Sequence, residues 1–162
     1  MRDEFINTLS NNVSLNKNIH LITADLGFGV FDEFRKNFSD NFLNVGIAEQ
    51  NMTLIASGMA LSMLKVFTYS IGNFSTLRCL EMIRNEVCYH ELNITIVSVG
   101  AGYSYGPLGF SHHATEDISI MRGLPKLKVY VPATLQEVRI ITDYLCGNNK
   151  PSYLRLDKSV AY

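Results

Sequence analysis

The sequence has no long apolar run and no targeting signal. No run reaches the roughly 18 apolar residues that a membrane-spanning helix needs. The opening MRDEFINTLSNN is charged and polar, whereas a signal peptide is basic and then apolar. We therefore expect no membrane span and no signal peptide, and we expect a cytoplasmic location.

The sequence also lacks tryptophan and an excess of either charge. Lys and Arg total 14 and Asp and Glu total 15, a net charge of -1, which argues against binding to a nucleic-acid backbone. Only 18% of the residues are charged, below the usual share of about 25%, and 47% are hydrophobic. So little charge in a small domain leaves apolar surface that a subunit interface normally covers. We predict an oligomer with no nucleic-acid partner.

Cysteines are few and unpaired in their spacing. Cys79, Cys88 and Cys146 are odd in number, lie far apart and form no Cys-x-x-Cys motif. This pattern excludes a disulfide framework and a zinc knuckle. We expect three buried thiols.

Short apolar runs alternate with helical patterns along the chain. Strands are predicted at residues 19–24, 42–45, 66–69, 94–99, 127–131 and 152–156, and helices at residues 3–15, 48–64, 74–90, 111–123 and 135–146. Residues 94–99 (ITIVSV) are continuously apolar, which is typical of a central parallel strand covered on both faces. The alternation predicts one α/β domain over residues 1–162: a doubly wound, mainly parallel sheet of about six strands with helices on both faces.

Ligands of such a sheet bind beyond the carboxyl ends of its strands, where three loops are unusual. In the first, NVGIAEQNM at 44–52, Glu49 falls in the first turn of a helix. An acidic residue there can simply complement the helix dipole. The alternative is a partly buried carboxylate that exchanges a proton or holds a protonated ring nitrogen. Both interpretations stay open on the residues alone.

The second loop is YSIGNFSTL at 69–77, where Ile71 and Phe74 bracket a turn opened by Gly72. An aromatic side chain in this place serves either the core or as a platform for a flat heterocycle. Arg78 and Arg84 follow, but they are six residues apart and do not share a helix face. We therefore do not predict that they form one anion site.

The third loop, GAGYSYGPLGFSHHATED at 100–117, has glycines at spacings that fit neither a dinucleotide fingerprint nor a phosphate loop. His112 and His113 each have a carboxylate four residues later, Glu116 and Asp117. Neighbouring histidines point to different faces of a helix, so each pair supplies only two ligands and a metal site is disfavoured. Loop histidines beside glycines fit a substrate pocket better.

Taken together, these segments resemble one known domain. DLGF at 25–28, FLNVGIAEQNM at 42–52, GNF at 72–74, GPLGFSHHATED at 106–117 and RGLPKLKVYVPAT at 122–134 follow the order of the motifs in the pyrimidine-binding (central) domain of the transketolase family of thiamine diphosphate enzymes. The resemblance covers nearly the whole chain. It is greatest to split transketolase-like and deoxyxylulose-phosphate synthase-like proteins.

The resemblance implies roles around the cofactor. Glu49 would bond the aminopyrimidine ring nitrogen, which promotes loss of the thiazolium proton. Phe74 would pack on the pyrimidine face, and Ile71 and Ile47 would line the same slot. Asp25 corresponds to an acidic residue near the cofactor cleft at the subunit boundary.

For the substrate, the resemblance implies that His112 is both catalytic and substrate-binding, with His113 beside it. Some family features are replaced, since Gly100 stands where sugar-phosphate transketolases carry a histidine, and Leu108 stands where they carry an acidic residue. Leu77 replaces another aromatic of the slot. These changes put the usual pentose phosphate substrates in doubt.

The sequence contains no Gly-Asp-Gly, the family's magnesium motif. We expect the diphosphate-binding and carboxy-terminal domains to be absent and a partner subunit to hold Mg²⁺ and the diphosphate. The expected assembly is a homodimer or heterotetramer acting on a small sugar. The resemblance thus implies the pyrimidine-side component of a transketolase-type transferase, inactive alone, that moves a two-carbon ketol unit between sugars or sugar phosphates.

Two alternatives stay open. One is a non-catalytic assembly or regulatory subunit that keeps the fold and the dimer surface, which Gly100, Leu108 and the missing domains favour. The other is a stand-alone domain that binds a small molecule and matches the motifs incidentally.

Overall fold

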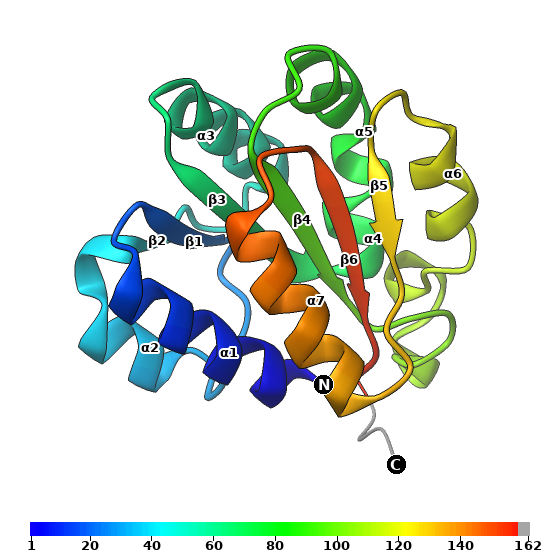
Figure 1. The fold of residues 1–162 in the computed structure, drawn as a ribbon. Coiled ribbons are helices and arrows are strands. Elements are labelled where there is room, and N and C mark those ends of the chain that lie inside the picture. The colour runs from blue at the N-terminus through cyan, green and yellow to red at the C-terminus, as the bar shows by residue number, and fades with distance from the viewer. Residues whose placement is uncertain (159–162) are drawn as a thin grey trace.

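The computed structural model describes residues 1–158 as a six-stranded sheet between helices (Figure 1). The strands are β1 (Ile19–Thr23), β2 (Phe42–Asn44), β3 (Lys65–Ile71), β4 (Ile94–Val99), β5 (Lys128–Tyr130) and β6 (Ser152–Leu156). The helices are α1 (Arg2–Leu15), α2 (Asp32–Asn37), α3 (Glu49–Leu61), α4 (Gly72–Ser75), α5 (Leu80–Met82), α6 (Asp117–Gly123) and α7 (Leu135–Gly147). Residues 159–162 of the predicted domain lie outside the described residues.

The sheet is parallel throughout. Its strand order is β2-β1-β3-β4-β6-β5, and every neighbouring pair runs in the same direction. All residues of β3 and β4 are buried. The predicted fold class and the central place of residues 94–99 are therefore confirmed.

Each face of the sheet carries its own apolar core. On one face, α1, α2 and α7 pack against the sheet through Phe5, Leu9, Phe34, Val138 and Leu145. On the other face, α3, α6 and the segment after α5 contribute Met52, Ala56, Ile83 and Met121. Figure 1 shows α1 and α7 in front of the strands. The helices thus cover both faces and leave the carboxyl edge of the strands to the loops.

One predicted helix is broken. Residues 74–90 form α4, a 3-10 turn (Leu77–Cys79), α5 and a π-helical segment (Ile83–Cys88) rather than one helix. The hydroxyl groups of Ser75 and Thr76 both donate to the carbonyl oxygen of Gly72, at 3.3 and 2.6 Å. Such bonds compete with the regular helical pattern, and the backbone of Thr76 leaves it, with φ -111° and ψ -82°.

A second predicted helix begins later than expected. The prediction placed its start at Ser111, but α6 begins at Asp117, and Phe110–His112 form only a 3-10 turn. The backbone of His113 is extended, and Ala114 pairs with Gly102 in an antiparallel bridge. This bridge holds the segment between His112 and α6 open as a loop.

The three cysteines are free and buried, as predicted. Burial raises the pKa of the Cys79 and Cys88 thiols to about 11 and that of Cys146 to about 12. These thiols therefore stay protonated and belong to the core. None of the helices within residues 1–158 has the length and apolar character of a membrane span.

Lys65 gives the core a pH dependence. It is 3% exposed and donates to the hydroxyl of Thr95 (2.9 Å) and the carbonyl of Asn148 (3.2 Å). Burial lowers the pKa of Lys65 to about 7 from 10.5. Between these values the unfolded chain binds a proton that the folded chain does not, so the free energy of unfolding rises with pH.

We expect that free energy to increase by about 1–2 kcal/mol between pH 7 and 8.5. Lys65→Met should flatten this increase. The measurement is urea unfolding of both proteins across this pH range, which lies below the titration of the buried thiols. Equal slopes for the two proteins would contradict the assignment.

Candidate active site

The candidate site lies where the loops after β2, β3 and β4 meet at the carboxyl edge of the sheet. Glu49 follows β2, Phe74 follows β3 and His112 follows β4. Because β1 separates β2 from β3 in the sheet, Asp25 lies on the loop between the first two of them. The topology thus places the candidate residues along one edge, as the sequence predicted.

Glu49 is the first residue of α3 and is only 2% exposed. Gly46, with φ +75°, turns the chain between β2 and α3, and the amide of Ala48 donates to the Gly46 carbonyl at 2.8 Å. The partial positive charge at the helix start favours a carboxylate. The Oε2 atom of Glu49 accepts a hydrogen bond from Nη1 of Arg78 at 2.7 Å. This is an ion pair between a buried anion and a half-exposed cation.

Phe74 lies in α4 beside two other groups. The guanidinium carbon of Arg78 is 4.2 Å from the centre of the Phe74 ring. On the Phe74 ring, His112 also packs at 65°, with the ring centres 5.0 Å apart. The Nδ2 atom of Asn73 donates to the carbonyl of Ser111 at 2.9 Å, which ties α4 to the histidine loop. Glu49, Phe74 and His112 therefore form one cluster, with Arg78 between the first two.

The histidine loop is anchored by a buried carboxylate. Asp117 accepts hydrogen bonds from the hydroxyl of Tyr153 (2.6 Å) and from Nε of Arg155 (2.7 Å). Arg155 also donates to the carbonyl of Ala114 at 3.0 Å. Burial and the adjacent Asp117 raise the pKa of Tyr153 well above its usual value, so this phenol stays a donor. The network fixes the end of the loop that carries His112.

The two histidines have different surroundings. Nδ1 of His112 lies 3.0 Å from the hydroxyl of Ser111, and its ring faces Phe74. Nε2 of His113 lies 3.0 Å from the carbonyl of Gly106, and its ring packs edge-on to Tyr103 at 4.9 Å. The structure therefore brings His112, but not His113, against Phe74. Within residues 1–158 no three His, Cys, Asp or Glu side chains gather closely enough to hold a metal ion.

Asp25 belongs to an adjoining polar cluster. Its backbone is left-handed, with φ 55°, and its carboxylate accepts from Nδ2 of Asn44 at 3.1 Å. The Oδ1 atom of Asn44 accepts from the amides of Asp25 (2.9 Å) and Gly46 (3.0 Å). Asn44 thus joins the loop that carries Asp25 to the turn that leads to Glu49.

The two predicted isoleucines differ in exposure. Ile71 ends β3 and is 8% exposed, so it lies in the core beneath α4. Ile47 is 81% exposed. Within the described chain, Ile71 is placed to support the cluster, whereas Ile47 projects from its rim.

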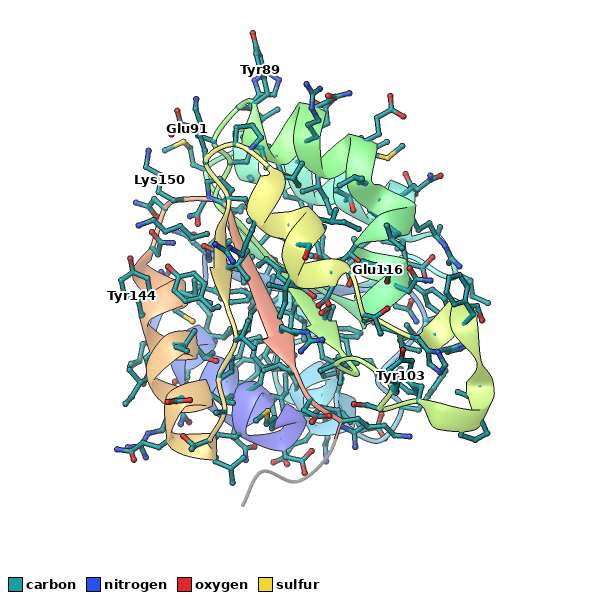
Figure 2. All side chains as sticks on the ribbon, turned by 90° about the vertical axis from the view of Figure 1, so that its right-hand side faces the viewer. Tyr89, Glu91, Tyr103, Glu116, Tyr144 and Lys150 are labelled. Atoms are coloured by element: carbon teal, nitrogen blue, oxygen red, sulfur yellow. The ribbon has the colours of Figure 1, made fainter. Side chains whose placement is uncertain are left out.

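A separate charged cluster lies at the other end of the sheet. Figure 2 shows Tyr89, Glu91 and Lys150 there, far from Tyr103 and Glu116 near the loop after β4. Glu91 accepts from Lys126 (2.7 Å) and Lys150 (2.9 Å), and these contacts lower the pKa of its carboxyl to about 2. This exposed cluster links surface loops and takes no part in the candidate site.

Sequence reasoning missed Arg78. The expectation that Arg78 and Arg84 do not form one anion site agrees with the structure, because Arg84 bonds the side chain of the adjacent Asn85. A signal was present, since Arg78 follows Phe74 by four residues, one helical turn. Its partner Glu49 is 29 residues away and has no local spacing that reveals the pair.

Comparison with known proteins identifies the family. The family model of the transketolase pyrimidine binding domain matches residues 1–162. One of the two subunits of an apulose-4-phosphate transketolase from Actinobacillus succinogenes is 34% identical over 157 residues, which cover 97% of this chain and 50% of that protein. A putative transketolase C-terminal section from Methanocaldococcus jannaschii is 36% identical over 143 residues, 88% of this chain and 45% of the relative.

The fold gives the same result. A split-gene transketolase solved as an inactive beta4 tetramer matches with a TM-score of 0.88 and 34% identity, over 98% of this chain and 51% of that one. This chain spans about half the length of these relatives. The predicted resemblance is confirmed: the chain belongs to the transketolase family and is similar over its length to the pyrimidine-binding domain.

Proposed function

We propose that this chain is the pyrimidine-side component of a thiamine diphosphate-dependent, transketolase-type enzyme. It would transfer a two-carbon ketol unit between sugars or sugar phosphates. The observation that carries this proposal is the buried carboxylate of Glu49, which bonds a flat cation that stacks on Phe74. An aminopyrimidine ring that bears a proton is also flat and donates a hydrogen bond, so these residues fit that group.

Each residue of the cluster has a proposed task. When bound, thiamine diphosphate supplies a carbon nucleophile that can carry the ketol unit. Glu49 holds a proton at the pyrimidine nitrogen, Phe74 packs on the face of the ring and Ile71 supports Phe74 from below. His112, next to Phe74, bonds the hydroxyl groups of the sugar. Asp25, Ile47 and His113 complete the rim of the cofactor and substrate site.

A partner is part of the proposal. Four large apolar side chains are exposed along the loop edge: Phe28 (80%), Ile47 (81%), Leu77 (44%) and Phe110 (82%). The hollow beside Asp25 measures only about 40 Å³, well below the 300 Å³ or more of a typical ligand pocket. Both features fit a site closed by a second surface. We propose that a partner domain with the Gly-Asp-Gly motif supplies this surface and holds Mg²⁺ and the diphosphate.

The proposal also covers domain content, assembly and location. We propose that residues 1–162 are one pyrimidine-binding domain without the diphosphate-binding and carboxy-terminal domains. The proposed assembly is a homodimer or a heterotetramer, and the proposed location is the cytoplasm. The relatives' halves that this chain does not span motivate the partner domain.

One observation favours a second candidate, a non-catalytic subunit that keeps the fold and the interface. Gly100 has φ +93°, and a Cβ atom there would clash with the ring of Tyr105. The histidine that sugar-phosphate transketolases carry at this position does not fit this backbone. A different substrate or a loss of catalysis are the two consequences.

Reconstitution separates these candidates. The chain and a diphosphate-domain partner, each inactive alone, should together transfer a ketol unit from a ketose donor to an aldose acceptor. A complex that assembles and binds the cofactor but transfers no ketol unit, across a panel of phosphorylated and free ketoses, would support the non-catalytic subunit.

Phe74→Ala should weaken the binding of thiamine diphosphate to that complex. Loss of an aromatic stacking partner costs about 0.5–1.5 kcal/mol, which corresponds to a dissociation constant roughly two- to tenfold higher. Tyr144→Ala is the matched control, because Tyr144 is a half-exposed aromatic on α7, on the other face of the sheet (Figure 2). Equal affinities for Phe74→Ala and the wild type would remove Phe74 from the site.

A further inference from the structure

Arg78 fills the space between Glu49 and Phe74. Its Nη1 atom is 2.7 Å from Oε2 of Glu49, and its guanidinium carbon is 4.2 Å from the centre of the Phe74 ring. One group thus makes a charged hydrogen bond to the buried carboxylate and a cation–π contact with the aromatic face. The two contacts define a single slot.

The guanidinium group has the shape and charge of a protonated heterocycle. It is planar, cationic and a hydrogen-bond donor, and it stacks on aromatic rings. A pyrimidine ring that bonds Glu49 and also stacks on the same face of Phe74 would have to lie where this group lies. The two occupants therefore exclude each other.

Arg78 is also free to leave. Its side chain is 43% exposed, whereas that of Glu49 is 2% exposed. Its backbone is held separately, since Nε2 of Gln50 donates to the Arg78 carbonyl at 3.0 Å. Rotation of the side chain into solvent breaks the two slot contacts without disturbing a core residue.

We propose that Arg78 is a displaceable placeholder of the pyrimidine slot, an inference that rests on the proposed function. Without cofactor it pairs with Glu49, because a buried carboxylate without a partner is costly. On binding, the pyrimidine ring takes over both contacts and Arg78 turns outward. Arg78 thereby sets the affinity of the complex for its cofactor, since each binding event must break the ion pair.

The test is calorimetric titration of thiamine diphosphate, with Mg²⁺, into the complex of the full chain with its diphosphate-domain partner. Arg78→Ala should bind about three- to tenfold more tightly than the wild type, because no contact has to be broken. Arg78→Lys keeps the charge without the planar stacking and should shift the affinity less. Arg84→Ala, which removes an exposed arginine outside the slot, is the control and should match the wild type.

Unchanged or weaker binding by Arg78→Ala, with wild-type binding intact, overturns the placeholder and leaves the proposed function standing. Absence of binding by every protein, the wild type included, overturns the proposed function and the placeholder with it.

Crystal structures of the wild-type complex give a readout that needs no variant. The 2.7 Å contact between Arg78 and Glu49 should be present without cofactor and broken with it. A contact retained in the cofactor-bound structure would contradict the placeholder.

Discussion

Replacing Glu49 by glutamine should lower the turnover of the reconstituted complex by about 10²–10³-fold. Proton transfer by a positioned side chain contributes on the order of 10²–10⁴ to a rate. The amide keeps the shape of the carboxyl group, but it cannot carry a negative charge or exchange a proton at the pyrimidine nitrogen. The loss should therefore appear in the rate of ketol transfer measured at saturating cofactor and substrate.

Two further measurements make this result specific. Glu33→Gln removes an exposed carboxylate from α2, on the other face of the sheet, and should leave turnover unchanged. Thermal unfolding of Glu49→Gln should show a folded protein. Full activity of Glu49→Gln in a complex that needs added cofactor would show that Glu49 does no chemistry and serves only the helix end.

Replacing Asp117 by alanine should reduce the free energy of unfolding by about 3–5 kcal/mol. Asp117 is 2% exposed, and the side chain of its partner Arg155 is 15% exposed. Removing one member of a buried ion pair leaves the other charge without compensation, which is the reason for the large effect. The phenol of Tyr153 would also lose an acceptor.

The neighbouring carboxylate supplies the control. Glu116 is exposed and accepts only from the adjacent Thr115 hydroxyl among the contacts described, so Glu116→Ala should stay within about 0.5 kcal/mol of the wild type (Figure 2). Urea unfolding of both variants measures the difference. A loss below about 1 kcal/mol for Asp117→Ala would mean that the network is solvated rather than buried.

The sheet was predictable because its signals are local. Apolar runs such as residues 94–99 declare buried parallel strands, and the helices between them leave parallel pairing as the simplest topology. The breaks were not predictable from periodicity. Thr76 leaves the helical conformation because its hydroxyl bonds the Gly72 carbonyl, and His113 is extended because Ala114 pairs with Gly102. Side-chain and long-range contacts decide both places.

The candidate site was predictable in part for the same reason. Motif order placed Glu49, Phe74 and His112 on loops that the parallel topology brings to one edge. The ion pair of Glu49 with Arg78 joins residues 29 positions apart and follows from packing of α3 against the turn after α4. The Asp117 network joins loop to strand across 36 and 38 positions and has no sequence signature.

Titration of thiamine diphosphate with Mg²⁺ into this chain alone, and into its mixture with a diphosphate-domain partner, tests the central claim most directly. The account predicts tight binding in the mixture and none to the isolated chain, because Glu49 and Phe74 hold only the pyrimidine side of the cofactor. Failure of the mixture to bind, with both proteins folded and associated, would contradict the account. Equally tight binding to the isolated chain would contradict the shared site.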